Sequence, residues 1–446
     1  MNYFRLLQNL YQMKRNAGKT REQLRRLQEK KLRKLLLFAY ENSAYYHRTF
    51  EQAGITGKQI PNLPLNRFSS IDKREFLEHF DELVTIPGLS QEELRRFDEE
   101  EPADRQRFRD NCHVVHSSGS TGKPGYFVYD EKAWNEMLVG IIRAALWNMT
   151  MPRILKMLSG GLRIVYIAAT DGRYGGAMAV GDGIKGVHAS QLFLDIKTPL
   201  EEWVVRIQKF RPNMIIGYPS AIKILGELTE NGNVKMEVLR VISCGEPLSE
   251  GLRSYLEHVF SARVVNIYGA SESLALGVET DPAEGMVLFD DLNYIEVENG
   301  NMYLTSLYNY AQPLIRYRIS DRICLMEGQE GRCPFTRAES IRGRNEDLLW
   351  FMDGTGKREF LHPLAIEGFC IEGMLDYQFR QTENDTFEML VEVSDSTKKD
   401  FIHRQMMGQM RRILSEKQLD YVQFYVRFVE HILPDPRTGK KPLIIA

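Results

Sequence analysis

The sequence predicts an α/β protein with a large N-terminal domain built on mainly parallel sheets and a small α+β C-terminal domain. Buried parallel strands are indicated by four short, continuously apolar runs at residues 163–169, 213–219, 239–245 and 262–269. Helical spacing of apolar residues alternates with these runs, at 199–210 and 220–228, as in a parallel sheet that is covered by helices. After about residue 343 the pattern changes, which indicates the second domain.

Composition narrows the function classes. The chain has 446 residues, of which 43% are hydrophobic, enough for a substantial core. Lys plus Arg is 58 and Asp plus Glu is 60, so the net charge of −2 gives no reason to expect a nucleic-acid or membrane-surface protein. The five cysteines are scattered and contain no CxxC pair, which indicates neither a disulfide framework nor a zinc ribbon. No run of about 18 apolar residues is present, so we expect no membrane span and a cytoplasmic location.

The N-terminal residues 1–40 are predicted to form one or two helices. Basic residues far outnumber Glu22 and Glu29 between Lys14 and Lys34. A nucleic-acid or membrane contact is one interpretation, but a solvated helix face with its leucines turned inward explains the pattern better. Loops, short helices and a charged connection are expected from there to residue 110.

A candidate phosphate-binding loop follows a short predicted strand at 112–116. Two glycines allow the backbone of this loop to turn so that its N–H groups point together and form an anion cradle. Pro124 prevents a helix from starting there, the chain extends again over 126–129, and Asp130 is expected to cap the helix that follows. The loop consists of Ser117, Ser118, Gly119, Ser120, Thr121, Gly122 and Lys123.

This loop is not a Walker A loop. That motif requires glycine where this chain has Ser117, and serine or threonine where it has Pro124. The loop also runs into a strand instead of a helix. Two interpretations stay open from these residues alone: a phosphate loop of another design, or a surface turn that binds nothing.

The segments after the predicted parallel strands are where a ligand is expected, because ligands of open α/β sheets lie beyond the carboxyl ends of the strands. These segments read TDGRYGG at 170–176, YPS at 218–220, CGEP at 244–247 and YGASE at 268–272.

The C-terminal region is predicted to be a small domain of about a hundred residues. Apolar and polar residues alternate around Tyr377 and Phe379, over 387–393 and over 422–428. Asn384-Asp385 provides a turn between the first two strands, and an amphipathic helix is expected at about 396–417.

Five motifs in a fixed order carry a resemblance that covers nearly the whole chain. They are SSGSTGKP at 117–124, CGEP at 244–247, YGASE at 268–272, IRYRISD at 315–321 with RGRNED at 342–347, and PRTGK at 436–440. In this order they resemble the adenylate-forming superfamily of acyl-CoA synthetases and ligases, in its phenylacetate–CoA ligase and CapK-like branch. Residues 39–55 are also similar to the opening of that branch, with Ala44 where proline is usual.

The resemblance implies a two-step reaction and a two-domain organisation. A carboxylate attacks the α-phosphate of Mg·ATP to give an acyl-adenylate and pyrophosphate, and a thiol, typically that of coenzyme A, then displaces AMP. The cofactors implied are ATP, Mg²⁺ and coenzyme A. The large AMP-binding domain would span residues 1–343 and the small mobile domain residues 344–446. Glu346 lies where the family often has its hinge aspartate, and Asp347 is next to it.

Residue roles are implied motif by motif. Ser117 to Lys123 would hold the β- and γ-phosphates, Ser271 would donate to the α-phosphate, and Glu272 would hold Mg²⁺. Adenine and ribose would be contacted by Gly245, Glu246, Pro247, Tyr268, Gly269, Asp321 and Arg344. Lys440 matches the lysine that bridges the carboxylate and the α-phosphate, although Lys441 is adjacent and the spacing of PRTGKK is compressed. Glu272 and Asp321 also have structural alternatives to these roles. Glu272 could cap a helix, and Asp321 could form an ion pair with Arg316 or Arg318.

The acid-binding pocket is the least specified part. We expect Gly175, Gly176, Tyr218 and Pro219 to line it. Arg173 could meet a polar group of the acid, but a surface position suits it better. His113, His116, Cys244 and Cys324 show no ligand spacing, so no structural zinc is predicted.

Three functions compete at this point. The first is an AMP-forming carboxylate–CoA ligase, with an aromatic acid suggested by the family alone. The second keeps adenylation but transfers the acyl group to a carrier-protein thiol, or to an amine or hydroxyl of a sugar or cofactor. The third is a nucleotide-binding scaffold without turnover, against which Glu272, Asp321 and Lys440 argue. Small-molecule partners, no nucleic acid and a monomer or homodimer are expected.

Overall fold

The structure is a computed structural model of the whole chain. It describes residues 3–100, 107–109, 111–116, 125–168, 170, 175–183, 189–195, 198, 200–319, 321–326, 333–344, 349–352, 358–361, 371–416, 419–433 and 444–445. Two separate hydrophobic cores lie within these residues, one built from residues up to Ala338 and one from Leu349 onward.

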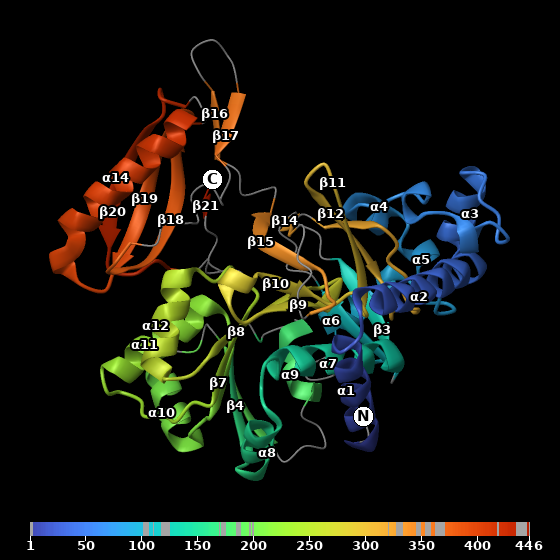
Figure 1. Cartoon of the computed structure of the whole chain (residues 1–446), viewed down its shortest axis with the longest axis horizontal. Helices are drawn as coiled ribbons and strands as arrows, with labels where there is room; N and C mark the ends of the chain where they lie inside the picture. Colours follow the sequence, from blue (N-terminus) through green and yellow to red (C-terminus); the bar gives the residue numbers. More distant parts are fainter. Residues whose placement is uncertain are drawn as a thin grey trace.

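A nine-stranded mixed sheet forms the centre of the large domain (Figure 1). Its order is β14-β15-β10-β9-β8-β7-β6-β4-β5. The strands are β4 (Leu162–Ala168), β5 (Ala189–Asp195), β6 (Met214–Gly217), β7 (Arg240–Cys244), β8 (Val264–Ala270), β9 (Ser273–Glu279), β10 (Met286–Leu288), β14 (Asp321–Leu325) and β15 (Arg337–Arg344). The five strands from β8 to β5 are parallel, and the four on the other side of β8 are antiparallel.

The four apolar runs of the sequence correspond to β4, β6, β7 and β8, which confirms the predicted parallel core of the sheet. The sequence analysis did not identify β5 or the antiparallel strands. Helices cover both faces of the parallel part, with α10, α11 and α12 together on one side and α7 and α9 on the other (Figure 1). Their bounds are α7 (Glu131–Ala145), α8 (Met151–Ser159), α9 (Gly175–Gly183), α10 (Leu200–Phe210), α11 (Pro219–Glu230) and α12 (Glu250–Phe260).

The N-terminal helices and two small sheets complete the large domain. The helices are α1 (Tyr3–Ala17), α2 (Arg21–Asn42), α3 (Ala44–Gln52), α4 (Lys73–Glu78), α5 (Phe80–Leu83) and α6 (Gln91–Glu100). The sheets are β1 (Arg107–Phe108), β2 (Cys112–His116) and β3 (Tyr126–Asp130), and β11 (Asn293–Glu298), β12 (Asn301–Ser306) and β13 (Tyr317–Ile319). Short 3₁₀ turns lie at Ile60–Asn62, Leu65–Arg67 and Pro282–Glu284. Asp130 caps α7 as predicted, because its carboxylate accepts from the Ala133 N–H at 2.7 Å.

A buried ion pair ties the N-terminal region to the central sheet. The Arg143 guanidinium donates to both oxygens of Asp291, at 2.8 and 3.0 Å, and Asn16 of α1 donates to the same carboxylate at 2.9 Å. Asp291 is 1% exposed, so its charge is stable only with these partners in place. Burial opposes ionisation of Asp291, but Arg143, Lys31 and Asn16 outweigh it and hold the pKa below its ordinary value.

The small domain is a four-stranded sheet covered by one long helix. Its order is β20-β19-β18-β21, in which β18 and β19 are antiparallel and the outer strands are parallel to their neighbours. The elements are β18 (Met374–Glu383), β19 (Thr386–Val393), a 3₁₀ turn (Ser396–Lys398), α14 (Lys399–Glu416), β20 (Gln423–Val429) and β21 (Ile444–Ile445), with a separate hairpin of β16 (Leu349–Met352) and β17 (Arg358–Leu361). This confirms the predicted fold class. Among the helices that the structure describes, none is long and apolar enough to cross a membrane.

Candidate functional site

Three neighbouring parallel strands end at one edge of the central sheet and carry predicted site residues there. Tyr218 follows β6, Gly245 follows β7, and Tyr268 and Gly269 lie at the end of β8. Because β6, β7 and β8 are adjacent and parallel, these residues lie side by side. This is the edge at which ligands of α/β sheets bind.

Gly245 and Tyr218 pack so closely that a side chain at 245 does not fit. Gly245 has a φ of +80°, and a Cβ on it would lie 2.8 Å from the Tyr218 ring. Its neighbour Glu246 accepts from the N–H and the hydroxyl of Ser220, at 3.1 and 3.0 Å, in the first turn of α11. Glu246 therefore caps α11, which holds the segment after β7 against the segment after β6. Pro247 continues this segment toward α12.

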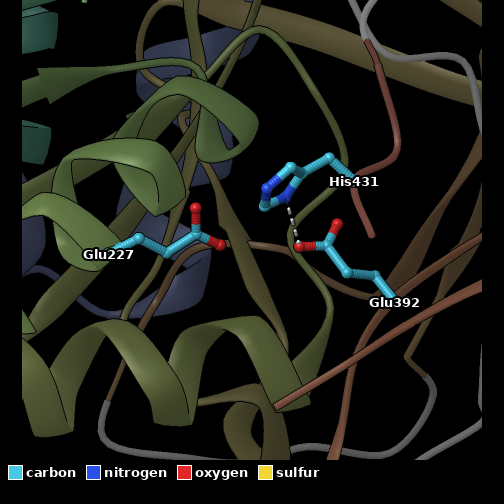
Figure 2. Close-up of side chains that lie close together, drawn as sticks. All are labelled: Glu227, Glu392 and His431. Carbon is cyan, nitrogen blue, oxygen red and sulfur yellow. Dashed lines mark hydrogen bonds and ion pairs between the residues drawn. The ribbon is translucent and has the colours of Figure 1, made fainter. Parts of the chain in front are cut away.

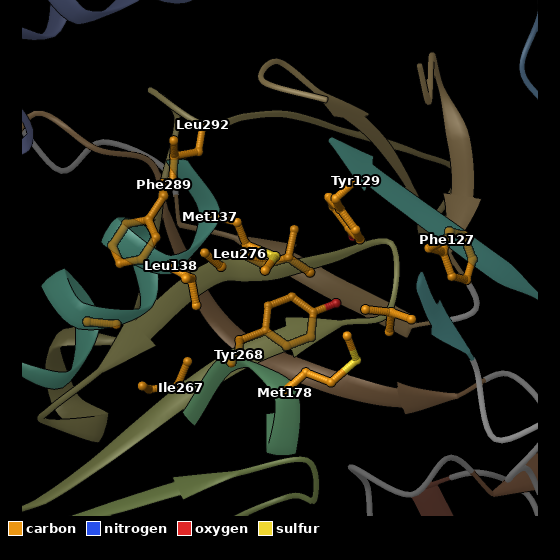
Figure 3. Close-up of a cluster of buried hydrophobic side chains, with 14 of the residues drawn as sticks. Phe127, Tyr129, Met137, Leu138, Met178, Ile267, Tyr268, Leu276, Phe289 and Leu292 are labelled. Atoms are coloured by element: carbon orange, nitrogen blue, oxygen red, sulfur yellow. The ribbon is translucent and has the colours of Figure 1, made fainter. Parts of the chain in front are cut away.

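Tyr268 and Asp321 are joined across the sheet. The Tyr268 hydroxyl donates to Asp321 Oδ2 at 2.8 Å and also lies 3.5 Å from Met302 Sδ. The Tyr268 ring is 9% exposed and lies near Met178, Ile267 and Leu276 (Figure 3). The Asp321 carboxylate is thereby held close to the end of β8.

Asp321 and Arg344 are directly paired, since Asp321 begins β14 and Arg344 ends β15 in the same antiparallel ladder. The two predicted ribose-binding residues therefore share one position at the edge of the sheet. The alternative partners of Asp321 are engaged elsewhere: Arg316 with Glu296 and Glu298, and Arg318 with Asp72.

Ser271 and Glu272 form the tip of a tight hairpin. Ala270 at the end of β8 pairs with Ser273 at the start of β9, so Ser271 and Glu272 make the two-residue turn. Glu272 therefore does not cap a helix that follows it, because the chain turns back into a strand at this point. The Ser271 hydroxyl donates to the His116 carbonyl at 3.4 Å. His116 is the last residue before the candidate phosphate loop, so the base of that loop lies beside the hairpin tip.

Two buried tyrosines hold this hairpin tip. The Tyr129 hydroxyl donates to the Ser271 carbonyl at 2.7 Å. The Tyr317 hydroxyl hydrogen bonds to the Glu272 carboxylate. The Tyr317 ring is packed edge-to-face against Phe76 and Phe127, at centroid distances of 5.7 and 6.3 Å. Burial, and then the charge and hydrogen bond of Glu272, raise the pKa of Tyr317, so the hydroxyl stays protonated and donates.

Gly175 and Gly176 begin α9 where the helix approaches the sheet. A Cβ on Gly175 would lie 2.7 Å from Leu274, and one on Gly176 would lie 2.5 Å from the Tyr166 hydroxyl. Tyr166 lies on β4, next to β6 and its Tyr218. The structure therefore brings three of the four predicted acid-pocket residues to one edge, with Tyr166 as a neighbour that the sequence analysis did not identify. The fourth, Pro219, is the first residue of α11.

Curated relatives of the chain are ligases. The phenylacetate–coenzyme A ligase of Thermus thermophilus is 28% identical over 406 residues, which cover 84% of this chain and 82% of the relative. The phenylacetate–coenzyme A ligase of Escherichia coli is 26% identical over 354 residues, covering 74% of this chain and 72% of the relative. The chain is a relative of the phenylacetate–coenzyme A ligases. No protein-family model matches it.

A solved structure confirms the fold of the chain. A 2-hydroxyisobutyryl-CoA ligase, crystallised in the postadenylation state with 2-HIB-AMP, superposes with a TM-score of 0.71 at 18% identity. The alignment covers 97% of this chain and 91% of that chain, so both domains are included. The predicted resemblance and fold are therefore confirmed.

Several predicted positions lie outside the described residues. They are Ser117 to Lys123, Arg173, Glu346, Lys440 and Lys441. Among the residues that the structure describes, Tyr129, Tyr166 and Tyr317 are neighbours of the site that were not predicted from the sequence. Tyr317 stands inside the quoted IRYRISD motif, so its position was visible, but an apolar strand pattern gives an aromatic residue no distinct signal there.

Proposed function

We propose that this chain is an ATP-dependent, AMP-forming acid–thiol ligase, which activates a carboxylic acid as an acyl-adenylate and then forms a thioester with coenzyme A. The observation that carries the proposal is one juxtaposition. Tyr268, the Ser271–Glu272 hairpin tip and the Asp321–Arg344 pair lie at the edge of the sheet, next to the base of the glycine- and serine-rich loop. The identity of the curated relatives supports the same activity.

The two half-reactions balance without a further reactant. A carboxylate oxygen attacks the α-phosphorus of ATP, the bond to the β-phosphate oxygen breaks, and pyrophosphate leaves. The sulfur of coenzyme A then attacks the acyl carbon, AMP leaves, and the thiol proton goes to solvent. Binding both reactants in one cleft aligns the attacking and leaving groups, which accounts for a large part of such a rate enhancement.

The nucleotide would bind along the edge of the sheet. Tyr268 would pack on the adenine, with Gly245, Glu246, Pro247 and Gly269 beside it, while Asp321 accepts from the ribose hydroxyls and Arg344 reaches the same sugar. Ser271 would donate to the α-phosphate, and Ser117 to Lys123 would hold the β- and γ-phosphates. The contact between Ser271 and His116 supports this order, because it joins the α-phosphate donor to the base of the loop.

Glu272 is the residue that would hold Mg²⁺. Its carboxylate belongs to the hairpin tip whose Ser271 contacts His116, the residue before the candidate phosphate loop, and Mg²⁺ prefers carboxylate and phosphate oxygens as ligands. Bound there, the ion would offset the negative charge of the phosphates. The Tyr317 hydroxyl holds the Glu272 side chain in position. Because this hydroxyl is neutral, it does not compete with Mg²⁺ for the carboxylate as a lysine or arginine would.

The small domain would supply the lysine of the first half-reaction. Lys440, or its neighbour Lys441, would bridge the attacking carboxylate and the α-phosphate. We propose that the chain divides at about the predicted boundary of 343/344, with Glu346 as the hinge, and that Arg344, which pairs in the central sheet, stays with the large domain. The two separate cores support such a division.

The acid is proposed to be an aryl acid, since the curated relatives are named for phenylacetate. It would lie near Gly175, Gly176, Tyr218 and Pro219. A cytoplasmic location is part of the proposal, and it agrees with the four cysteines that the structure describes, none of which forms a disulfide.

Pyrophosphate release tests the proposal. Purified protein is incubated with Mg·ATP and a panel of acids, including phenylacetate, benzoate, 2-hydroxyisobutyrate and straight-chain fatty acids, each with and without coenzyme A. We expect release that requires an acid and turns over when coenzyme A is added. Release that coenzyme A does not stimulate would favour a carrier-protein thiol, an amine or a hydroxyl as the acceptor. If no acid produces release while ATP still binds, the scaffold interpretation replaces this one.

A further inference from the structure

The small domain meets the large domain along α11 and α12. A Cβ on Gly251, in the first turn of α12, would lie 3.7 Å from the Met374 carbonyl at the start of β18. Charged side chains of α11 and β19 make a second contact among the described residues. It is unusual because the two residues at its centre, Lys223 and Glu392, are 4% and 3% exposed.

Glu392 has partners from both domains. Its carboxylate pairs with the Lys223 ammonium of α11. It also accepts from His431 Nδ1 at 3.2 Å (Figure 2). Its other oxygen accepts from the Ile432 N–H at 3.2 Å. Glu392 therefore binds α11 on one side and the segment after β20 on the other.

Lys223 has a second carboxylate within reach. Its ammonium lies 3.2 Å from Glu227, one turn along α11. Ligand atoms of Glu227, Glu392 and His431 lie within 4.8 Å of one another, which is close enough for a metal ion. The Lys223 ammonium already pairs with both carboxylates, however, so the positive charge that this cluster needs is present in the protein itself.

Lysine 440 follows this cluster closely in the sequence. Ile432, which Glu392 holds, precedes Lys440 by eight residues (432 to 440), and β21 begins four residues after it (440 to 444). Ile444 is paired with Phe379 of β18. The segment that carries the proposed lysine is thus attached at its upstream end to the cluster and at its downstream end to the sheet.

We propose that Lys223 and Glu392 are positioning residues for the adenylation half-reaction: their buried ion pair fixes the small domain against α11, and Glu392 also anchors Ile432, just upstream of the segment that carries Lys440. A buried ion pair adds little net stability, because both charges lose their water, but it disfavours every arrangement that separates them. This inference rests on the proposed function, whereas its structural part, the fixed orientation, does not.

A double-mutant cycle on pyrophosphate release tests the functional part. Lys223→Met and Glu392→Gln should each lower acid-dependent release by about tenfold to a hundredfold, and the double variant should lose no more than either single variant. Glu279→Gln is the control, because it breaks a mostly buried pair, Arg253–Glu279, that lies entirely within the large domain. We expect it to lower the melting temperature and to change release by less than about threefold.

Hydrogen exchange tests the structural part without catalysis. Once Lys223 is removed, the buried Glu392 carboxylate has to move toward water, so peptides that contain Ile432 should exchange faster in Lys223→Met than in the wild type. Glu279→Gln should leave these peptides unchanged.

Three results would overturn the inference: wild-type release in both single variants, an additive loss in the double variant, or equal loss in Glu279→Gln. Unchanged exchange at Ile432 in Lys223→Met would overturn the fixed orientation. If the wild type releases no pyrophosphate with any acid, the proposed function fails, and the exchange measurement still decides whether the ion pair fixes the domains.

Discussion

The Tyr268 hydroxyl donates a hydrogen bond to the Asp321 carboxylate at 2.8 Å, although the two residues lie 53 positions apart and on different strands of the central sheet. Asp321 is in turn the cross-strand partner of Arg344. Tyr268, Asp321 and Arg344 were each assigned to the nucleotide from a separate stretch of sequence. In the structure they are neighbours, because Tyr268 bonds to Asp321 and Arg344 lies opposite Asp321 in the ladder. The carboxylate proposed to accept from the ribose is oriented before any ligand arrives.

Tyr268→Phe removes only the hydroxyl that orients Asp321. We expect ATP to bind about three- to tenfold more weakly, because the carboxylate loses one of its hydrogen-bond donors while the ring stays in place. Isothermal titration with ATP measures this directly. Tyr425→Phe, at an exposed position in the small domain, is the control. Unchanged ATP affinity in Tyr268→Phe would mean that this hydrogen bond plays no part in nucleotide binding.

Tyr317→Phe is expected to raise the Mg²⁺ concentration needed for half-maximal pyrophosphate release by about three- to tenfold. The Tyr317 hydroxyl holds Glu272, and phenylalanine keeps the ring packed edge-to-face against Phe76 and Phe127. The rate at saturating Mg²⁺ should stay within about twofold of the wild type. A fall in that rate with an unchanged Mg²⁺ requirement would place the role of the hydroxyl elsewhere.

Lys440→Ala is expected to slow acid-dependent pyrophosphate release by about a hundredfold to a thousandfold, because the charge that offsets repulsion between two anions is lost. Lys441→Ala should change the rate by less than about threefold. The reverse result would exchange the roles of the two neighbours. If both variants, and the variant lacking both lysines, release pyrophosphate normally, the first half-reaction must use another cation.

Gly245→Ala should lower the free energy of unfolding by about 1–3 kcal/mol, since alanine is strained at a φ of +80° and its methyl group would contact the Tyr218 ring. Gly408→Ala, within α14 and with nothing within 4 Å of the added carbon, should instead raise it by about 0.5–1 kcal/mol. Urea denaturation measures both values. Equal effects of the two substitutions would contradict the close packing at Gly245.

Asp290 and Asp291 are adjacent, and their pKa values are shifted in opposite directions. Burial raises the pKa of Asp290 from 3.8 to about 6. The folded protein therefore binds this proton more tightly than the unfolded chain does, so stability falls as the pH rises from about 4 to about 6 and stays lower above that. Asp290→Asn should raise the free energy of unfolding at pH 7.5 by about 1–2 kcal/mol and flatten that decline.

Asp291→Asn provides the opposite case. The pKa of Asp291 is lowered, so its contribution to stability is present at neutral pH and is lost only as the pH falls through the folded-state value. We expect this variant to lose about 3–5 kcal/mol at pH 7.5, because Arg143 is left buried without its carboxylate. Melting curves between pH 4.5 and 7.5 separate the two variants. Stabilisation by Asp291→Asn would contradict the ion pair.

The parallel half of the sheet could be predicted from the sequence because β4, β6, β7 and β8 are buried on both faces and read as continuous apolar runs. The antiparallel half could not. β10 has only three residues, and the turn between β8 and β9 is Ser271–Glu272, which lacks the glycine or asparagine that usually marks a two-residue hairpin.

The site, like the sheet, was predicted only where the signal lies within a short stretch of sequence. Residues within compact motifs, such as Gly245, Tyr268 and Asp321, could be named because their spacing in the chain is itself distinctive. Contacts between distant segments could not. Lys223 and Glu392 are 169 positions apart, and each reads as an ordinary charged residue on an amphipathic element, so only the folded chain shows that they meet.

The pairing of Asp321 with Arg344 limits where any movement of the small domain can begin. Because Arg344 is held in the ladder of the large domain, a rotation that preserves the sheet must start after it. Asp321 and Arg344 would then keep their contacts with the ribose during the rotation. The small domain would move Lys440 away from the nucleotide. The Lys440 ammonium could therefore leave the α-phosphate, and the thiol could enter, while the acyl-adenylate stays bound through its ribose.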